Sequence, residues 1–345
     1  MRKTSTLATA IAFAVTAHPG LAAEPASISF SHNDWELACD NTRTCRAAGY
    51  HAETGQNPPV TVLLERRAGP GTPIVAQLIF GDEEDAVARS GDLTMSVDGR
   101  AMGDIEFSPN GSGAVLSPAQ TAALLRAVVG TSKVAWHEEG RTWTLSGKGA
   151  SAVLLKMDEF QGRLGTPGAI IRKGSNAESA VLPAIPAPVV VAAKVPGTAL
   201  PSLNKDDQRQ LLATLRKTTD DEVCADLAAI PTGENEFSYA PLTKDKMLVS
   251  ARCWRGAYNE GHGYWIANRK PPFSPVLVTE LGTDYDQGTI TGAHKGRGIG
   301  DCWGHNKWVW DGRRFVHTDS YTTGMCREIT AGGAWTLPTL VSEVR

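Results

Sequence analysis

The sequence predicts a mixed, β-rich α+β fold of two domains, each a mainly antiparallel β sandwich or partly open barrel with one or two helices. Short runs of β-forming residues recur along the chain between Gly and Pro residues. An Ala, Pro and Val tract at 174–201 interrupts this pattern, as an extended linker does. The predicted boundaries are a signal peptide at 1–23, a first domain at 24–173, the linker at 174–201 and a second domain at 202–345.

The first 23 residues have the pattern of a secretory signal peptide. Arg2 and Lys3 precede an apolar, uncharged stretch at Leu7–Ala17, and small residues follow before Glu24. The apolar stretch is shorter than the roughly 20 residues that a membrane span needs. We therefore expect a periplasmic or secreted protein whose mature form has no membrane span.

The charge balance argues against nucleic acid as a partner. The chain has 34 Lys and Arg residues against 37 Asp and Glu residues, and its basic residues are scattered apart from pairs such as Arg66-Arg67. A surface that follows a phosphate backbone needs clustered cations. An envelope protein or a glycan is the expected partner.

The cysteines predict disulfides rather than a metal site. Six cysteines all lie beyond the signal peptide: Cys39, Cys45, Cys224, Cys253, Cys302 and Cys326. An even number in an exported chain favours bridges, and no C-x-x-C is present; only Cys302 has a histidine, His305, at the spacing of zinc ligands. Sequence alone leaves the connectivity open. The linker makes Cys39–Cys45 a local pair, and for the other four we prefer Cys224–Cys253 and Cys302–Cys326.

Strand-like runs make up most of the first domain. A hairpin is expected around Trp35, where apolar residues alternate up to Cys39 and turn residues precede Cys45. Further strands are predicted at Val60–Leu64, Ile74–Phe80, Leu93–Val97, Ile105–Phe107, Val134–His137 and Trp143–Leu145.

One helix among these strands has clear start and stop signals. Ser117 is the expected N-cap, Pro118 takes the first helical position, and Gln120 completes a capping box. The apolar run that follows ends at Gly130.

A second helix is predicted within Gly149–Gly165, because Val153, Leu154, Met157 and Phe160 share helical spacing. Asp158, Glu159 and Arg163 lie beside this apolar face, and we interpret them as solvated surface. Acid and base catalysis is disfavoured because consecutive helical carboxylates point about 100° apart.

The second domain is predicted to begin with a helix and to continue as strands. Asn204 is the expected cap, with Asp206 and Asp207 in the first turn, and a short helix at Asp220–Ala229 includes Cys224. Asp284–Gly288 resembles the start of a calcium loop but lacks the later acidic ligands, so a β-turn is expected. Strands are predicted at Met247–Trp254, Tyr264–Ala267, Val276–Glu280, Thr289–Thr291 and Ala334–Leu337.

Asp311-Gly312 between aromatic β-formers predicts a hairpin. A loop of just these two residues would pair Trp310 with Arg313 and Trp308 with Phe315, so that three aromatic rings and a guanidinium share one face. That face is either a core pair covered by Arg313 or a platform for a ligand.

The candidate ligand-binding residues lie in and after the glycine-rich stretch that precedes the hairpin. Aromatic and polar side chains together suit a glycan, a peptide or a protein. In the alternative, the stretch is a tight connection in which Arg297 and Asp301 form an internal ion pair. Asn259, His262 and Tyr264 are candidate neighbours. The candidates are Arg297, Asp301, Trp303, His305, Trp308, Trp310 and Arg313.

No catalytic residue, metal site or cofactor is predicted. G-x-S-x-G, H-E-x-x-H, Walker and dinucleotide-binding motifs are missing from the sequence. Oxidised cysteines also lack the thiolate that nucleophilic catalysis requires.

Three stretches, Asp34–Tyr50, Val62–Gly69 and Gly296–Gly312, resemble a family of secreted proteobacterial proteins catalogued as domain of unknown function eleven-seventy-six. The resemblance covers nearly the whole mature chain, including the cysteine positions and the Gly149–Gly165 helix. It implies no activity, because the family has no assigned catalytic residues. The first domain is also loosely similar to invasion-associated locus B proteins, which implies an envelope or host-contact role.

These observations predict an exported protein with a non-catalytic binding or envelope-associated role. Two alternatives remain open. One is a periplasmic hydrolase acting on cell wall or polysaccharide, and the other is a secreted host-contact factor.

Overall fold

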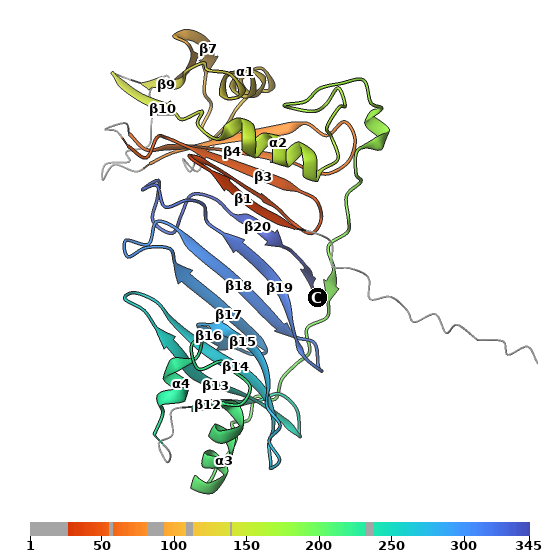
Figure 1. Ribbon diagram of the computed structural model, residues 1–345, viewed down its shortest axis with the longest axis vertical. Coiled ribbons are helices and arrows are strands. Elements are labelled where there is room, and N and C mark those ends of the chain that lie inside the picture. The colour runs from red at the N-terminus through yellow and green to blue at the C-terminus, as the bar shows by residue number, and fades with distance from the viewer. Residues whose placement is uncertain (1–26, 55–57, 82–92, 108–112, 139, 232–236) are drawn as a thin grey trace, which may run out of the picture.

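The computed structural model describes residues 27–54, 58–81, 93–107, 113–138, 140–231 and 237–345. The predicted signal peptide lies outside the described residues. The fold is β-rich with few helices, as predicted, and the sheets in the described ranges are open and mainly antiparallel (Figure 1). In the described ranges, no helix combines the length and apolar character that a membrane crossing requires.

A six-stranded antiparallel sheet forms the first layer of the N-terminal part. The predicted hairpin is present as its second and third strands, in which Cys39 pairs with Cys45 and is bonded to it by a disulfide. In sheet order the strands are β1 (Ile28–His32), β2 (Trp35–Cys39), β3 (Cys45–Tyr50), β4 (Val60–Arg66), β5 (Ile74–Phe80) and β8 (Ala114–Val115).

A smaller sheet and two helices cover one face of this sheet. They share one apolar core with it, which includes Trp35, Leu64, Trp136 and Leu154. The expected strand at Ile105–Phe107 is reduced to one bridge, between Phe107 and Ala114. The smaller sheet has the order β10 (Arg141–Leu145), β9 (Val134–Glu138), β6 (Thr94–Val97) and β7 (Arg100–Asp104), and the helices are α1 (Pro118–Val129) and α2 (Ala150–Phe160).

The start of α1 confirms the predicted capping box. The Ser117 hydroxyl accepts a hydrogen bond from the Gln120 backbone N–H, and the Gln120 side chain accepts one from the Ser117 N–H. The helix ends before Gly130, as predicted.

The interpretation of Asp158 and Arg163 as solvated surface is wrong, because both side chains are fully buried. Asp158 Oδ2 accepts hydrogen bonds from the N–H groups of Ile170 and Ile171, and Oδ1 lies 3.7 Å from Arg66. Arg163 donates to the backbone oxygens of residues 67 and 69. Buried charges need such partners, so these residues fix the chain after α2 against the sheet.

The Pro-rich segment 174–201 is extended for most of its length but packs against the rest of the chain. It contains a 3-10 turn, Glu178–Ala180, and the strand β11 (Val189–Val190), which pairs in parallel with β21 (Glu343–Val344). The Ala193 N–H then donates to the Trp310 carbonyl. The division into domains at this segment stays a prediction.

Two antiparallel sheets pack face to face in the C-terminal part. One side of the first sheet packs on the second through Leu248, Tyr264, Ile290 and Trp310. The first sheet has the order β12 (Phe237–Pro241), β13 (Lys246–Arg255), β14 (Glu260–Asn268) and β15 (Val276–Gly282). The second has the order β16 (Asp284–Asp286), β17 (Thr289–Lys295), β18 (Trp303–Trp310), β19 (Phe315–Thr322) and β20 (Leu337–Leu340).

Two helices cover the other side of the four-stranded sheet: α3 (Lys205–Leu215) and α4 (Ala225–Ala229). The predicted cap of α3 is confirmed, since Asn204 Oδ1 accepts hydrogen bonds from the N–H groups of Asp206 and Asp207. The predicted bridge Cys224–Cys253 joins the start of α4 to β13. Asp284–Gly288 comprises β16 and the turn at Gln287 and Gly288 that joins it to β17, as the β-turn prediction implies.

The other face of the six-stranded sheet, opposite α1 and α2, packs against the chain segment between β19 and the end of β20 (Figure 1). Tyr50 donates a 2.6 Å hydrogen bond to Glu36 Oε1, which also accepts the Met325 N–H at 2.7 Å. The Trp335 indole donates to the Thr61 hydroxyl at 2.9 Å. We call this contact the junction.

A buried ion pair lies at one end of the junction. Arg327 donates to Asp34 Oδ1 at 3.0 Å, and the two side chains are only 8% and 10% exposed. The Ser146 hydroxyl donates to the other oxygen of Asp34 at 2.6 Å. Gly324, two positions before Cys326, is close to the sheet as well: a Cβ at this residue, whose φ is +100°, would lie 2.3 Å from the Tyr50 hydroxyl.

Replacing Arg327 by Ala is expected to lower the free energy of unfolding by about 3 kcal/mol, because Asp34 would remain buried without its cation. Chemical denaturation of the oxidised protein measures this loss. Arg100→Ala removes an exposed arginine and should stay within about 0.5 kcal/mol of the parent. A loss at Arg327 no larger than at Arg100 would show that the pair does not stabilise the junction.

Candidate functional site

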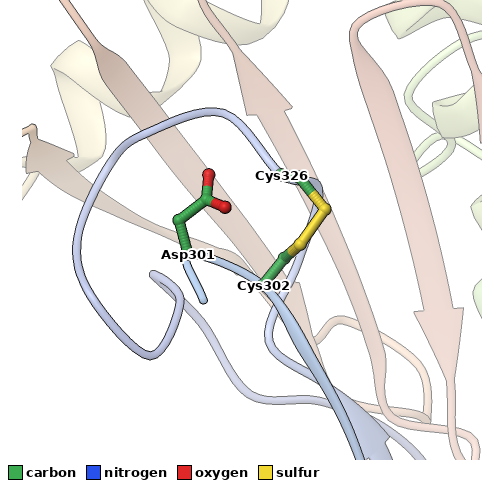
Figure 2. Close-up of side chains that lie close together, drawn as sticks. All are labelled: Asp301, Cys302 and Cys326. Atoms are coloured by element: carbon green, nitrogen blue, oxygen red, sulfur yellow. A yellow bond between two sulfur atoms is a disulfide. The ribbon is translucent and has the colours of Figure 1, made fainter. Parts of the chain in front are cut away.

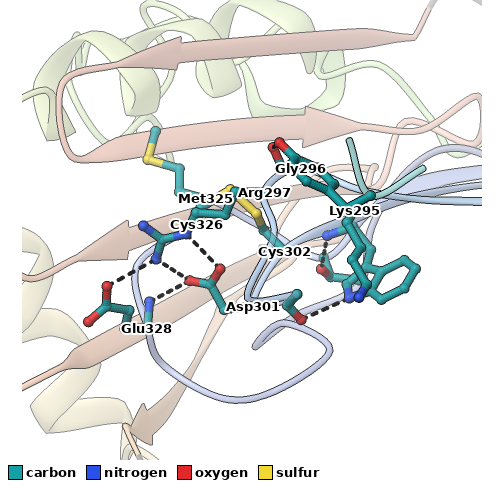
Figure 3. Close-up of a disulfide and its surroundings, with 12 residues drawn as sticks. Lys295, Gly296, Arg297, Asp301, Cys302, Met325, Cys326 and Glu328 are labelled. Carbon is teal, nitrogen blue, oxygen red and sulfur yellow. Dashed lines mark hydrogen bonds and ion pairs between the residues drawn. A yellow bond between two sulfur atoms is a disulfide. The ribbon is translucent and has the colours of Figure 1, made fainter. Parts of the chain in front are cut away.

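The glycine-rich stretch forms a loop closed by an ion pair between Arg297 and Asp301, the internal contact expected if the stretch is a tight connection. Arg297 donates from Nε to Asp301 Oδ1 at 2.8 Å and from Nη2 to Oδ2 at 2.5 Å (Figure 3). The Glu328 N–H also donates to Asp301 Oδ2 at 2.7 Å. The hydrogen bonds from Arg297 lower the pKa of Asp301. Both side chains are therefore already engaged within the protein.

The predicted Cys302–Cys326 disulfide lies directly beside this ion pair. Asp301 and the two sulfur atoms form a group of possible metal-ligand atoms within 4.8 Å of one another (Figure 2). Sulfurs bonded to each other lack the thiolate that zinc requires, and Asp301 already accepts three hydrogen bonds. A Cβ at Gly296 would lie 2.6 Å from the Cys302 sulfur, so glycine permits this close approach. The arrangement fits a structural cross-link.

Two of the candidate tryptophans are buried. Trp310 is 1% exposed and packs between the two C-terminal sheets, while Trp308 is 8% exposed and stacks on His317 at 4.8 Å. These two side chains contribute to the core and present no platform to solvent.

The predicted register of the Trp hairpin is wrong by two residues. Trp310 pairs with Phe315 rather than Arg313, and Trp308 pairs with His317 rather than Phe315. The Asp311 carboxylate accepts hydrogen bonds from the N–H groups of Arg313 and Arg314, which stabilises a longer loop. Arg313 is consequently exposed in this loop and does not cover Trp310.

The remaining two candidates belong to an accessible row of aromatic rings. Trp303 stacks on His305 with ring centroids 6.1 Å apart, and His305 stacks on Tyr321 at 4.6 Å. All three side chains are partly exposed. The Lys295 ammonium lies 5.4 Å from the centre of the Trp303 ring, a cation–π distance.

A cavity of about 230 Å³ adjoins this row at the junction. Strands β1 and β2 form one wall, and β18, β19 and β20 form the other. The lining therefore joins residues more than 250 positions apart in the chain, which no local sequence signal could bring together. Its polar members are Ser29, Glu36, His305, Asn306, Ser320, Tyr321, Thr322 and Thr339.

One predicted neighbour of the loop is in contact with it. Asn259 donates to the Lys295 carbonyl at 2.8 Å and accepts the Lys295 N–H at 2.9 Å. Tyr264 is instead buried between the two sheets, and His262 lies 3.8 Å from Glu260. Of these three, only Asn259 adjoins the candidate loop through hydrogen bonds given by the structure.

A family model described as a protein of unknown function, DUF1176, matches residues 29–342. The chain belongs to this family. It is also 28% identical over 346 residues to an uncharacterized protein, YpfG, of Escherichia coli strain K12, with 92% of this chain and 93% of that protein covered. No solved structure matches the chain. For this DUF1176 chain, functional inference therefore depends on the geometry of the site.

Burial favours the uncharged forms of two groups in the cavity wall. It raises the pKa of Glu36, although the hydrogen bonds from Tyr50 and Met325 oppose the rise. Burial also lowers the pKa of His305, and the nearby His294 lowers it further. The environment thus disfavours charge of either sign.

The stability of the protein is expected to fall as the pH decreases through about 6.5, the ordinary pKa of histidine. Below that value the unfolded chain binds protons that the folded chain does not, because the pKa of His305 is lowered in the fold. Denaturant titrations across this range should show a weaker pH dependence in His305→Gln. His32→Gln, at an exposed ring, is the control. Equal pH slopes in the parent and His305→Gln would contradict the expectation.

Proposed function

We propose that the chain is an exported, envelope-associated binding protein that holds one unit of a glycan in the junction cavity. The observation that supports this most is the meeting of an accessible aromatic row with a cavity lined by hydroxyl, amide and imidazole groups. Aromatic rings contact the apolar faces of sugars, and neutral polar groups hydrogen-bond their hydroxyls.

The direction of these pKa shifts supports a neutral ligand. The raised pKa of Glu36 and the lowered pKa of His305 have the same cause, burial, and a charged ligand would meet the same desolvation cost. A polyhydroxylated ligand avoids this cost while using the available donors and acceptors.

The size of the cavity supports a single unit rather than a whole oligosaccharide. About 230 Å³ is below the range of roughly 300–1,000 Å³ that encloses most small ligands. The rest of a longer chain would extend outward, past the edges of Tyr321, His305 and Trp303.

Export is part of the proposal. Three disulfides are typical of an oxidising compartment, and the first 23 residues have the pattern of a leader. The host-contact alternative has only the loose resemblance to invasion-associated locus B proteins in its favour.

One observation favours the hydrolase alternative. Glu36, whose pKa is raised by burial, lines the cavity, and such a carboxyl group can act as a general acid. Glycoside hydrolysis ordinarily uses two carboxyl groups that flank the scissile bond. Among the described lining residues Glu36 is the only carboxylate, so binding without turnover is the better-supported function.

Tyr321→Ala and Trp303→Ala should each weaken binding of peptidoglycan-derived or other envelope glycans about tenfold, because each removes aromatic contact area. A glycan array followed by calorimetry on the oxidised protein measures the affinity. The matched control is Tyr258→Ala, at a tyrosine that is 48% exposed and outside the cavity lining.

Unchanged glycan binding in both variants, with the fold intact by circular dichroism, would place the ligand elsewhere. If no glycan binds the parent, the proposed ligand class is wrong. Release of sugar that is lost in Glu36→Gln would establish the hydrolase instead.

A further inference from the structure

We propose a second site, separate from the junction, that binds an amphipathic anion: an aliphatic chain that ends in a carboxylate. The site is a half-open cavity of about 670 Å³ in the C-terminal part. It lies between the segment preceding α3, the turn from β12 to β13, and the turn that follows β14. Its volume is within the roughly 300–1,000 Å³ of typical ligand pockets.

The floor of this cavity is apolar. Met247 is 1% exposed and belongs to the core that α3 and α4 cover, and Leu200, Leu203 and Tyr239 pack against the same core. The floor therefore continues a hydrophobic core to the surface. An aliphatic chain placed on it would bury apolar area at about 25 cal/mol per Å².

The rim adds three cations to the floor, Lys244, Arg269 and Lys270, against two acids, Asp207 and Asp245. Both acids have partners nearby. Asp207 accepts a hydrogen bond from the Asn204 side chain at 2.9 Å, and Asp245 lies 3.9 Å from Lys244.

Two of the cations keep donors available toward the cavity. Arg269 uses Nε to bind the Lys246 carbonyl, and no hydrogen bond of its terminal nitrogens is found within the described ranges. Lys270 is exposed and has no ion-pair partner among the described residues. A positive rim in a chain of net charge −3 is a local feature rather than a reflection of a basic protein.

Tyr239 places one more polar group at the floor. Its hydroxyl oxygen accepts the Leu203 N–H at 3.0 Å. That bond fixes the ring and leaves the hydroxyl proton to be donated, and a carboxylate oxygen accepts such a proton well. The first N–H groups of α3 are used by the Asn204 side chain, so the helix end is not needed for the anion.

These features together select a ligand with two chemically distinct ends. The aliphatic chain would lie on Leu200, Leu203 and Met247, and the carboxylate would meet Arg269 and Lys270. A neutral glycan would leave the apolar floor uncovered, and a cation would be repelled by the rim.

Calorimetric titration of the oxidised full chain with dodecanoate, near neutral pH and below micelle formation, tests the site. We expect one-to-one binding that is at least about tenfold weaker in Arg269→Gln with Lys270→Gln, because charge-assisted hydrogen bonds are lost. The matched control is Arg172→Gln with Lys173→Gln, an exposed Arg-Lys pair elsewhere, which should bind like the parent.

A second probe tests recognition of the head group. Dodecyltrimethylammonium has the same chain length and the opposite charge, so it should bind far more weakly than dodecanoate. Equal binding of the two probes, equal loss in both double variants, or no dodecanoate binding by the parent would overturn the proposal. None of these three outcomes depends on the glycan experiments, since the two cavities share no lining residue.

Discussion

The packing of the segment after β19 onto the six-stranded sheet is the constraint on which the rest of the structure depends. Without this segment, the sheet face would expose Ala48 and Leu63 beside Glu36. Neither water nor an apolar surface alone would satisfy this mixture of apolar and polar groups. The segment supplies both kinds of partner, with Trp335 for the apolar area and the Met325 N–H for the carboxylate. Each contact specifies one position of the segment, because displaced polar groups would remain buried without partners.

The same contact creates the cavity, so the cavity forms only when the junction is folded. Its walls come from strands at opposite ends of the chain, and they meet only where the segment between them is held. The Cys302–Cys326 bridge and the hydrogen bond from the Glu328 N–H to Asp301 hold that segment against the start of β18. Several candidate residues identified from the sequence thus position the wall that contains His305.

Local signals in the sequence predicted the elements well, whereas partners distant in the chain could not be predicted. The Ser117 capping box and the Cys39–Cys45 pair depend on short spacings that a sequence displays directly. The register of the Trp hairpin depends on whether Asp311 accepts backbone N–H groups in a longer loop, and Asp-Gly is compatible with either loop. Asp158 is buried because backbone N–H groups after the helix donate to it. Tyr321 stacks on His305 because their strands pair. Neither leaves a periodic pattern in the sequence.

The two cavities differ in the charge that they tolerate, and this difference argues for two ligand classes. At the junction, burial raises the pKa of Glu36 and lowers the pKa of His305, so the surroundings of both groups disfavour their charged forms. At the second cavity three basic side chains line the rim above an apolar floor. A site that disfavours charge selects by hydrogen-bond geometry, while a charged rim over an apolar floor selects by the separation of charge from chain. One ligand cannot make both sets of contacts. A ligand suited to one cavity would therefore leave the polar and apolar groups of the other cavity without matching partners.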